Sequence, residues 1–242
     1  MRPVIEVERI SKSYRLDRTE VSALRDLDLA IGPGEFTALA GPSGSGKTTL
    51  LNIIGCIDKP DSGRLILEGE DVTSRTLNSL ASLRRDRLGY IFQLFNLIPV
   101  LTAYENVEYP LLLTPMPARE RRHRVEVLLE RVGLYDKRKH NPGQLSGGQR
   151  QRVAIARAMV SSPAAILADE PTANLDSVTS GEILDLMMEL NSERGTVFLF
   201  STHDPRIVSK ARRVIRLMDG KIIEDTATEP AAEVVAGGGV PC

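Results

Sequence analysis

Imperfect alternation of apolar and polar residues marks the first part of the chain. Apolar residues recur over residues 4–10 and again over 24–31, just before a Pro33-Gly34 turn. A period of two predicts strands that are buried on one face. Residues 36–40 form an apolar run that leads into a glycine-rich loop, and this run predicts a short buried strand. The N-terminal region is therefore predicted to consist of strands.

Helix and strand patterns alternate after the glycine-rich loop. Residues 48–57 predict a helix that ends before Pro60, because proline disfavours the helical conformation of the residue before it. A hairpin-like segment follows at 63–70. A charged helix is predicted at 77–87 and a strand at 88–92, so the chain reads as an α/β protein up to this point.

The pattern changes between Gln93 and residue 162. Strand alternation disappears, and helical periodicity takes over at 104–113, 118–132 and 147–160. We interpret residues 93–162 as a helical subdomain inserted into the α/β core.

The α/β pattern then resumes. A strand is predicted at 165–167, a helix at 177–190, and further strands at 196–201 and 214–218. The last stretch, 225–242, is rich in Ala, Gly and Glu and shows no apolar periodicity, so we expect a mobile tail there.

Composition and charge narrow the function classes. The chain of 242 residues is 42% hydrophobic and 26% charged, with a formal net charge of −1. This balance gives no electrostatic reason to expect nucleic acid as a partner. Cys56 and Cys242 show no metal-ligand spacing, and the N-terminus does not resemble a signal peptide. We therefore expect a reduced, cytosolic chain, and no stretch approaches the roughly 20 apolar residues of a membrane helix.

The glycine-rich loop matches the phosphate-binding pattern G-x-x-x-x-G-K-[ST] and stands between an apolar strand and a helix. Glycines let backbone N–H groups approach phosphate oxygens, and the following helix presents its positive end to the same anion. Lys47 is expected to reach the β- and γ-phosphates of ATP, and the Thr48 hydroxyl to ligate Mg²⁺. An incidental Gly/Ser-rich turn is the alternative. The predicted nucleotide-binding residues here are Gly41, Pro42, Ser43, Gly44, Ser45, Gly46, Lys47, Thr48 and Thr49.

Two carboxylates follow the apolar strand at 165–167. Asp169 and Glu170 are expected at the carboxyl edge of the sheet, where doubly wound folds bind ligands. Asp169 is predicted to hold Mg²⁺ and Glu170 to polarise the water that attacks the γ-phosphate. An Asp-Glu-Pro sequence is also a common exit from a strand into a turn. Together with the phosphate loop, the catalytic interpretation is favoured.

The run Leu-Ser-Gly-Gly-Gln-Arg-Gln-Arg-Val-Ala-Ile-Ala-Arg-Ala, which begins at Leu145, resembles the signature helix of ATP-binding cassette (ABC) ATPases almost letter for letter. Ser146 can cap this helix, while Gly147 and Gly148 leave bare N–H groups at its positive end. These residues, together with Gln149, predict a second anion site. A plain loop-to-helix junction is the alternative.

Other parts of the ABC pattern are present in order. Tyr14 stands where the family has an aromatic residue that stacks on adenine, although it also fits an ordinary strand end. Gln93 matches the family's glutamine that senses the γ-phosphate and Mg²⁺. Asp176, with Asn174 and Leu175, resembles the loop that contacts the other cassette, although many relatives have Ser or Ala in place of Asn174.

His203 follows an apolar strand and resembles the family's switch histidine. A lone histidine after a strand is usually structural. Its place after the acidic pair favours a catalytic contact with the γ-phosphate. The resemblance therefore assigns catalysis to Glu170, His203, Lys47 and Gln93, and metal binding to Thr48, Gln93 and Asp169.

The resemblance covers about residues 4–224 and implies a fold. It is an α/β ABC ATPase (P-loop NTPase) core with an N-terminal antiparallel β-subdomain and an inserted helical subdomain. Residues 1–224 are expected to form this domain, followed by the tail at 225–242. Two such cassettes pack head to tail with two ATP molecules between them. Each site then joins the loop around Lys47 of one copy to residues 146–149 of the other.

Several segments narrow the resemblance to the lipoprotein-releasing and macrolide-exporter branch, namely 51–58, 95–99, 101–107 and 168–172. This branch implies peripheral binding at the cytoplasmic face of a bacterial inner membrane. The partner is an integral membrane permease with a periplasmic domain. The apolar residues that follow Gln93 are expected either to line a groove for that partner or to pack internally; they are Phe95, Leu97, Ile98 and Leu101.

Three hypotheses follow for the whole protein. The first is an energising subunit of a transporter, of lipoprotein-release or macrolide- or peptide-export type. The second is a soluble ABC ATPase of DNA repair, chromosome organisation or translation. A single set of motifs in 242 residues fits it poorly. The third is a regulatory cassette that gates a periplasmic cell-wall hydrolase through a membrane partner.

Overall fold

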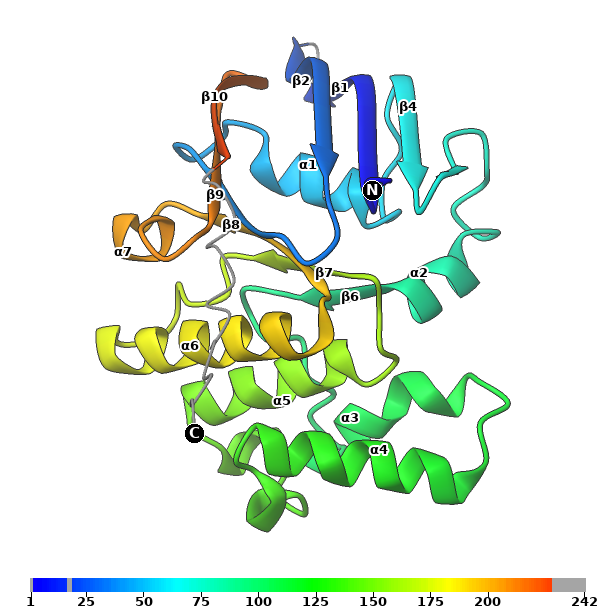
Figure 1. The fold of residues 1–242 in the computed structure, drawn as a ribbon, viewed down its shortest axis with the longest axis vertical. Helices are drawn as coiled ribbons and strands as arrows, with labels where there is room; N and C mark the ends of the chain where they lie inside the picture. Colours follow the sequence, from blue (N-terminus) through cyan, green and yellow to red (C-terminus); the bar gives the residue numbers. More distant parts are fainter. Residues whose placement is uncertain (1, 17–18, 228–242) are drawn as a thin grey trace, which may run out of the picture.

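The structure, a computed structural model, describes residues 2–16 and 19–227 of the chain, arranged as two sheets with helices around them (Figure 1). The strands are β1 (Ile5–Leu16), β2 (Thr19–Ile31), β3 (Phe36–Ala40), β4 (Ser62–Leu67), β5 (Glu70–Asp71), β6 (Leu88–Ile91), β7 (Ala165–Asp169), β8 (Val197–Thr202), β9 (Arg213–Met218) and β10 (Lys221–Ala227). The α-helices are α1 (Lys47–Ile54), α2 (Ala81–Arg87), α3 (Ala103–Leu112), α4 (Ala118–Arg131), α5 (Gly147–Met159), α6 (Ser177–Arg194) and α7 (Pro205–Val208), with short 3-10 helices at Tyr135–Lys137 and Pro142–Gln144.

The six-stranded sheet carries the strand ends that form the candidate site. Its order is β10-β9-β3-β8-β7-β6. Strand β3 pairs in parallel with β8 and β9, and β7 pairs in parallel with β6 and β8. Every residue of β3 and β8 is buried. Continuous apolar strands of this kind are typical of parallel sheets whose two faces are both covered.

The four-stranded sheet has the order β2-β1-β4-β5, and its pairs are antiparallel. The predicted N-terminal antiparallel β-subdomain is therefore confirmed. Helix α1 lies between this sheet and the six-stranded one (Figure 1). Its apolar residues Leu50 and Ile53 share one buried cluster with Ile5 and Leu27 of the antiparallel sheet and Leu167 of β7. Packing on both sides holds the start of α1, and with it the glycine-rich loop, between the two sheets.

Helices α3 and α4 lie at the end of the molecule opposite the antiparallel sheet, with α5 and α6 between them and the strands (Figure 1). One continuous core joins these layers. It runs from Phe36 and Phe198 of the sheet through Met159 of α5 to Val107 of α3 and Leu128 of α4. The helical subdomain proposed for residues 93–162 is thus an insertion in sequence that shares its core with the sheet. None of the helices in residues 2–16 and 19–227 has the length and apolar character needed to cross a membrane.

Several predicted boundaries are wrong. Helix α6 extends to Arg194, four residues past the predicted end at residue 190, and three further cases follow. Helix α1 ends at Ile54, three residues before the predicted end, because Gly55 follows and Cys56 adopts a positive φ of 54°. Helix α2 begins at Ala81, not at residue 77, since the preceding residues form a turn in which the Leu80 N–H donates to the Thr76 carbonyl.

The last of these cases concerns the C-terminal tail. Strand β10 was not predicted, and it extends through Ala227, so the tail cannot begin at Asp225. Asp225 pairs with Ile215 of β9, and its carboxylate forms an ion pair of 2.7 Å with Arg213. The rest of the expected tail, 228–242, lies outside the described residues.

Candidate nucleotide-binding site

The glycine-rich loop connects β3 to α1 in a backbone conformation that requires glycine. Gly46, the N-cap of α1, has φ 105°, and Gly41 has φ 154°. A Cβ at Gly46 would lie 2.5 Å from the Ala23 carbonyl oxygen, and one at Gly41 would lie 2.3 Å from that of Leu217. The loop is therefore pressed against two other segments, and its conformation is fixed before any ligand arrives.

Lys47 is folded onto its own loop. Its Nζ donates to the carbonyl oxygens of Gly41 (2.8 Å) and Pro42 (2.9 Å), and the residue is only 6% exposed. Burial lowers the pKa of this ammonium group, while the nearby carboxylates of Glu170 and Asp169 act in the opposite direction. The site thus holds a partly desolvated cation whose present acceptors are neutral carbonyls. A phosphate would be a stronger acceptor.

The hydroxyl of Ser45, also in the loop, is available to bind a ligand. The Ser45 hydroxyl is buried without a hydrogen-bond partner in the described residues. Buried polar atoms normally have a partner, because leaving one unpaired costs about 1–3 kcal/mol. An orphaned hydroxyl beside Lys47, in a loop of glycines at a helix start, fits a phosphate-bearing ligand.

Asp169 ends β7 and lies close to the phosphate loop. Its Oδ1 accepts hydrogen bonds from the Thr48 hydroxyl (3.2 Å) and from the Ser201 hydroxyl (2.6 Å). Ser201 stands beside Asp169 because β7 and β8 are paired in parallel with these two residues in register. A carboxylate and a hydroxyl are hard oxygen donors of the kind that Mg²⁺ prefers. The predicted metal residues Thr48 and Asp169 are thus brought together.

Glu170 is held in a strained backbone conformation. Its φ is 45°, which is uncommon for a residue with a side chain, and its N–H donates to the Ser201 hydroxyl (2.9 Å). Its Oε1 lies 2.8 Å from Nδ1 of His203. Ser201 therefore orients both neighbouring acidic residues, a role that the sequence analysis missed. The signal in the sequence was a serine near the end of a predicted strand that could pair with the strand ending in Asp169.

Tyr14 stands on β1 at the rim of a pocket of ≈210 Å³, and its hydroxyl donates to Asp58 (2.8 Å). Lys12 lies 5.3 Å from the ring centroid, and burial raises the pKa of the phenol. The ring is thus fixed by its neighbours and still 37% exposed. The pocket is lined by Tyr14, Ala23, Ser43, Gly44, Gly46, Lys47, Thr48, Thr49 and Glu170.

The predicted second anion site lies outside this pocket, at the start of α5. Ser146 caps the helix as expected. Its hydroxyl accepts from the Gln149 N–H (3.3 Å), and its own N–H donates to the Gln149 side chain (3.0 Å). Gly148 packs closely on α6, because a Cβ there would lie 2.5 Å from the Thr179 methyl. One chain therefore keeps its two candidate anion sites apart.

Asp176 has a local role that the sequence analysis did not consider. It is the N-cap of α6, and its carboxylate accepts from the N–H groups of Val178 and Thr179 and from the Thr179 hydroxyl. The hydrogen bond from that hydroxyl is the largest cause that lowers the pKa of Asp176. Gln93 is exposed on the loop after β6, where its carbonyl oxygen accepts from the Asn174 side chain (2.9 Å).

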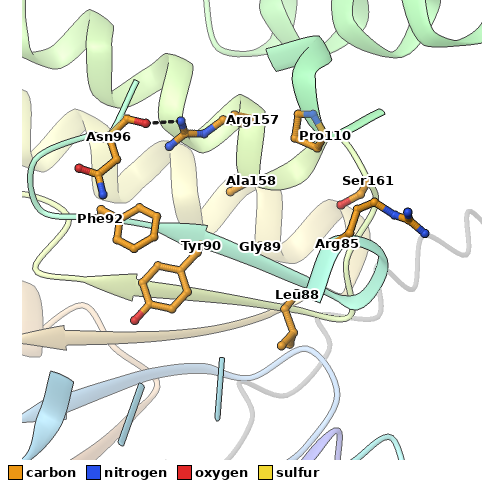
Figure 2. Close-up of a pocket in the computed structure, with 10 residues that line it drawn as sticks. All are labelled: Arg85, Leu88, Gly89, Tyr90, Phe92, Asn96, Pro110, Arg157, Ala158 and Ser161. Carbon is orange, nitrogen blue, oxygen red and sulfur yellow. Dashed lines mark hydrogen bonds between the residues drawn. The ribbon is translucent and has the colours of Figure 1, made fainter. Parts of the chain in front are cut away.

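A groove of ≈230 Å³ lies among β6, α3 and α5, lined by Arg85, Leu88, Gly89, Tyr90, Phe92, Asn96, Pro110, Arg157, Ala158 and Ser161 (Figure 2). This set differs from the expected one. Leu97 packs against the core, and Phe95 lies under the Arg150 guanidinium at 5.0 Å. Neither these two nor Ile98 and Leu101 line the groove.

Comparison with known proteins assigns the family. The model of the ABC transporter family matches residues 24–173. An uncharacterized ABC transporter ATP-binding protein of Thermotoga maritima is 46% identical over 222 residues, covering 92% of this chain and 94% of that protein. The macrolide export ATP-binding/permease protein MacB of Marinobacter nauticus is 47% identical over 234 residues, which agrees with the macrolide-exporter resemblance.

The match with MacB covers 96% of this chain but only 36% of MacB. This chain therefore spans about a third of the length of the macrolide-export relatives. Among solved structures, the ATP-binding cassette MJ0796, a dimer in a post-hydrolysis state bound to ADP and Pi, superposes with a TM-score of 0.85. It is 42% identical, and the match covers 94% of this chain and all of that one (100%). The chain therefore belongs to the ABC transporter family and is an ATP-hydrolysing cassette.

Proposed function

We propose that this cassette powers an export system at the inner membrane of a bacterium, by ATP-driven pairing of two copies that moves a membrane partner. One observation carries the proposal. The phosphate loop, the paired carboxylates and His203 meet at one sheet edge, while the capped start of α5 is separate from them. A site divided in this way is completed by a second copy.

In this proposal, Lys47 exchanges its two loop carbonyls for phosphate oxygens, and the loop N–H groups and the Ser45 hydroxyl bind the same phosphates. Thr48, Asp169 and Gln93 would hold Mg²⁺. When bound, Mg²⁺ supplies positive charge that offsets the charge developing on the phosphates. Tyr14 stacks on the adenine from the rim of the pocket.

Glu170 is proposed as the general base. Its carboxylate is only 22% exposed and lies at hydrogen-bond distance from His203, which orients it. The carboxylate accepts a proton from the water that attacks the γ-phosphate, and ADP leaves. Lys47 holds the γ-phosphate in line with that water. The strained φ of 45° aims the side chain towards the loop, and the Ser201 hydroxyl fixes the backbone in that conformation.

Ser146, Gly147, Gly148 and Gln149 are proposed to bind the γ-phosphate held by the other copy, with Asp176 alongside. The dimeric state of the structural neighbour MJ0796 supports this arrangement. The helix start offers free N–H groups and a positive dipole end. Contacts that form only in the closed pair shift the equilibrium towards closure when ATP binds.

The proposed membrane partner is an integral permease with a periplasmic domain, docking at the groove in Figure 2. The macrolide-export relatives, which carry a permease in the same chain by name, support such a partner. Exposed apolar residues flank the groove in sequence: Leu94 is 72% exposed, and Leu112 and Leu113 are 52% and 59% exposed. An apolar helix of the permease fits this surface.

Glu170→Gln tests the proposal. With ATP and Mg²⁺, the variant should elute as a stable dimer in size-exclusion chromatography and show turnover reduced by at least about 100-fold. Glu224→Gln is a matched control, because Glu224 lies on β10 in an exposed ion pair with Arg216. A Glu170→Gln protein that stays monomeric and hydrolyses ATP at the wild-type rate would disprove the assignment.

A further inference from the structure

The loop between Gln93 and Asn96 is held by side chains from two other parts of the chain. The Asn174 side-chain amide donates to the Gln93 carbonyl (2.9 Å). The Arg157 guanidinium donates to the carbonyls of Phe95 (2.8 Å) and Asn96 (2.5 Å), and the second of these bonds is visible in Figure 2. Three of the four carbonyls in this short loop therefore have side-chain donors.

The conformation of this loop needs such support. Phe95 and Asn96 have φ values of 63° and 46°, a region that residues with a side chain rarely adopt. Strained backbone of this kind persists only where the surroundings determine it. Arg157 lies on α5, the helix that begins beside Ser146. In the loop its guanidinium donates to backbone carbonyls rather than to a carboxylate.

Asn174 reaches the same loop from a different segment, the one that follows β7. It lies four residues after Glu170, in two consecutive turns closed by bonds from Ala173 to Glu170 and from Leu175 to Thr172. These turns leave little freedom between the general base and Asn174. The hydrogen bond from Asn174 thus joins the segment of Glu170 to the segment of Gln93, which is 81 residues away in sequence.

We propose that Asn174 is a positioning residue for Gln93. Its amide fixes the Gln93 carbonyl and so aims the Gln93 side chain at the metal and γ-phosphate region, with Arg157 as the second anchor of the loop. The inference rests on the proposed function in one respect, the role of Gln93. Phe92, Asn96 and Arg157 also line the groove. In this proposal, a partner that binds in the groove and moves these residues also shifts the loop and therefore Gln93.

The test is a double-mutant cycle of Asn174→Asp and Gln93→Ala. Aspartate keeps the shape of asparagine but has no N–H to donate. Loss of one hydrogen bond should reduce kcat by about 2- to 10-fold and raise the Mg²⁺ concentration for half-maximal activity, with the KM for ATP changed less. The double variant should be no worse than Gln93→Ala, because both changes remove the same function. Asn78→Asp, at an exposed site before α2, controls for the added charge.

Hydrogen–deuterium exchange of the chain without nucleotide gives a readout besides activity. The N–H groups of Phe95 and Asn96 are bonded within the loop, so Asn174→Asp should speed their exchange several-fold while the strands β3 and β8 stay protected. Arg157→Lys, which keeps the charge but loses the two-pronged donation, should speed it more.

Effects that multiply in the double variant, or an unchanged exchange rate in the loop, would overturn the proposal. So would a lower melting temperature of Asn174→Asp with no change in the Mg²⁺ requirement, since that pattern indicates a purely structural bond. If Gln93→Ala itself leaves the Mg²⁺ requirement unchanged, the metal role of Gln93 fails. The exchange experiment still decides whether Asn174 holds the loop.

Discussion

Two glycine-rich segments of the molecule lie at the start of a helix, α1 and α5, and they differ in what surrounds them. The loop at Gly41 is enclosed by other segments, contains a buried lysine, and lies beside two carboxylates. The helix start at Ser146 satisfies itself locally through Gln149 and lies outside the pocket. The first is equipped for chemistry, whereas the second offers only a positive helix end. In the proposed function, this difference explains why one copy holds the reactive groups and the second copy adds a helix start.

Lys47→Ala should have the largest effect, because Lys47 is the one cationic side chain among the described residues that line the pocket. Turnover should fall by at least about 100-fold, as expected for loss of a donor to the phosphates. An ATPase assay measures this, with Lys221→Ala on β10 as a control at an exposed position. Wild-type activity in Lys47→Ala would contradict the view that the loop at Gly41, unlike the helix start at Ser146, carries the reactive groups.

Mixing two inactive variants should recover activity if the two segments meet across copies. Lys47→Ala removes the cation of the loop, and Gly147→Asp places a side chain and a negative charge at the helix start, where an added Cβ would lie 3.2 Å from the Leu175 side chain. In an equal mixture half of the dimers are mixed, and each of these has one intact site. About a quarter of wild-type activity is therefore expected from the symmetry of the pair.

The mixture is measured by ATPase assay after equilibration of the two purified variants without nucleotide. Each variant alone is the control. Activity in the mixture no higher than the mean of the separate variants would mean that the loop and the helix start do not combine.

Ser146→Ala should have the smallest effect on the fold. Loss of an N-cap costs about 1 kcal/mol, which for a chain of this size lowers the melting temperature by about 2–4 °C. Differential scanning calorimetry measures this, with Ser82→Ala in α2 as a control for an exposed helical serine. A drop above about 10 °C would show that the helix start carries more of the packing than its local bonds suggest.

Local motifs in the sequence predicted much of the site. The Gly-x-x-x-x-Gly-Lys pattern predicted the loop at Lys47, and Ser146 in the Leu-Ser-Gly-Gly-Gln run predicted the helix cap; the structure has both. Alternation predicted the N-terminal strands and continuous apolar runs predicted the buried ones, whereas their division into an antiparallel sheet and a core followed from the family resemblance.

Features that depend on contacts between distant segments were not predictable. Ser201 bridges the acidic pair only because β7 and β8 adopt one register, and Asn174 meets Gln93 because the pairing of β6 with β7 brings together the segments that follow these strands. Strand β10 was missed because Lys221, Glu224 and Asp225 make it polar, and it is an edge strand stabilised by pairing with β9.

The single core that runs from the sheet through α5 into α3 and α4 has a consequence for protein engineering and for evolution. Because residues 93–162 are one continuous insertion in the sequence, they suggest a unit that could be exchanged between relatives. Exchange would carry Val107 and Leu128 into contact with another protein's Phe36 and Phe198, whose packing was not selected for them. Chimaeras in this family should therefore tolerate exchange of the whole chain, or of loops, better than exchange of the helical part alone.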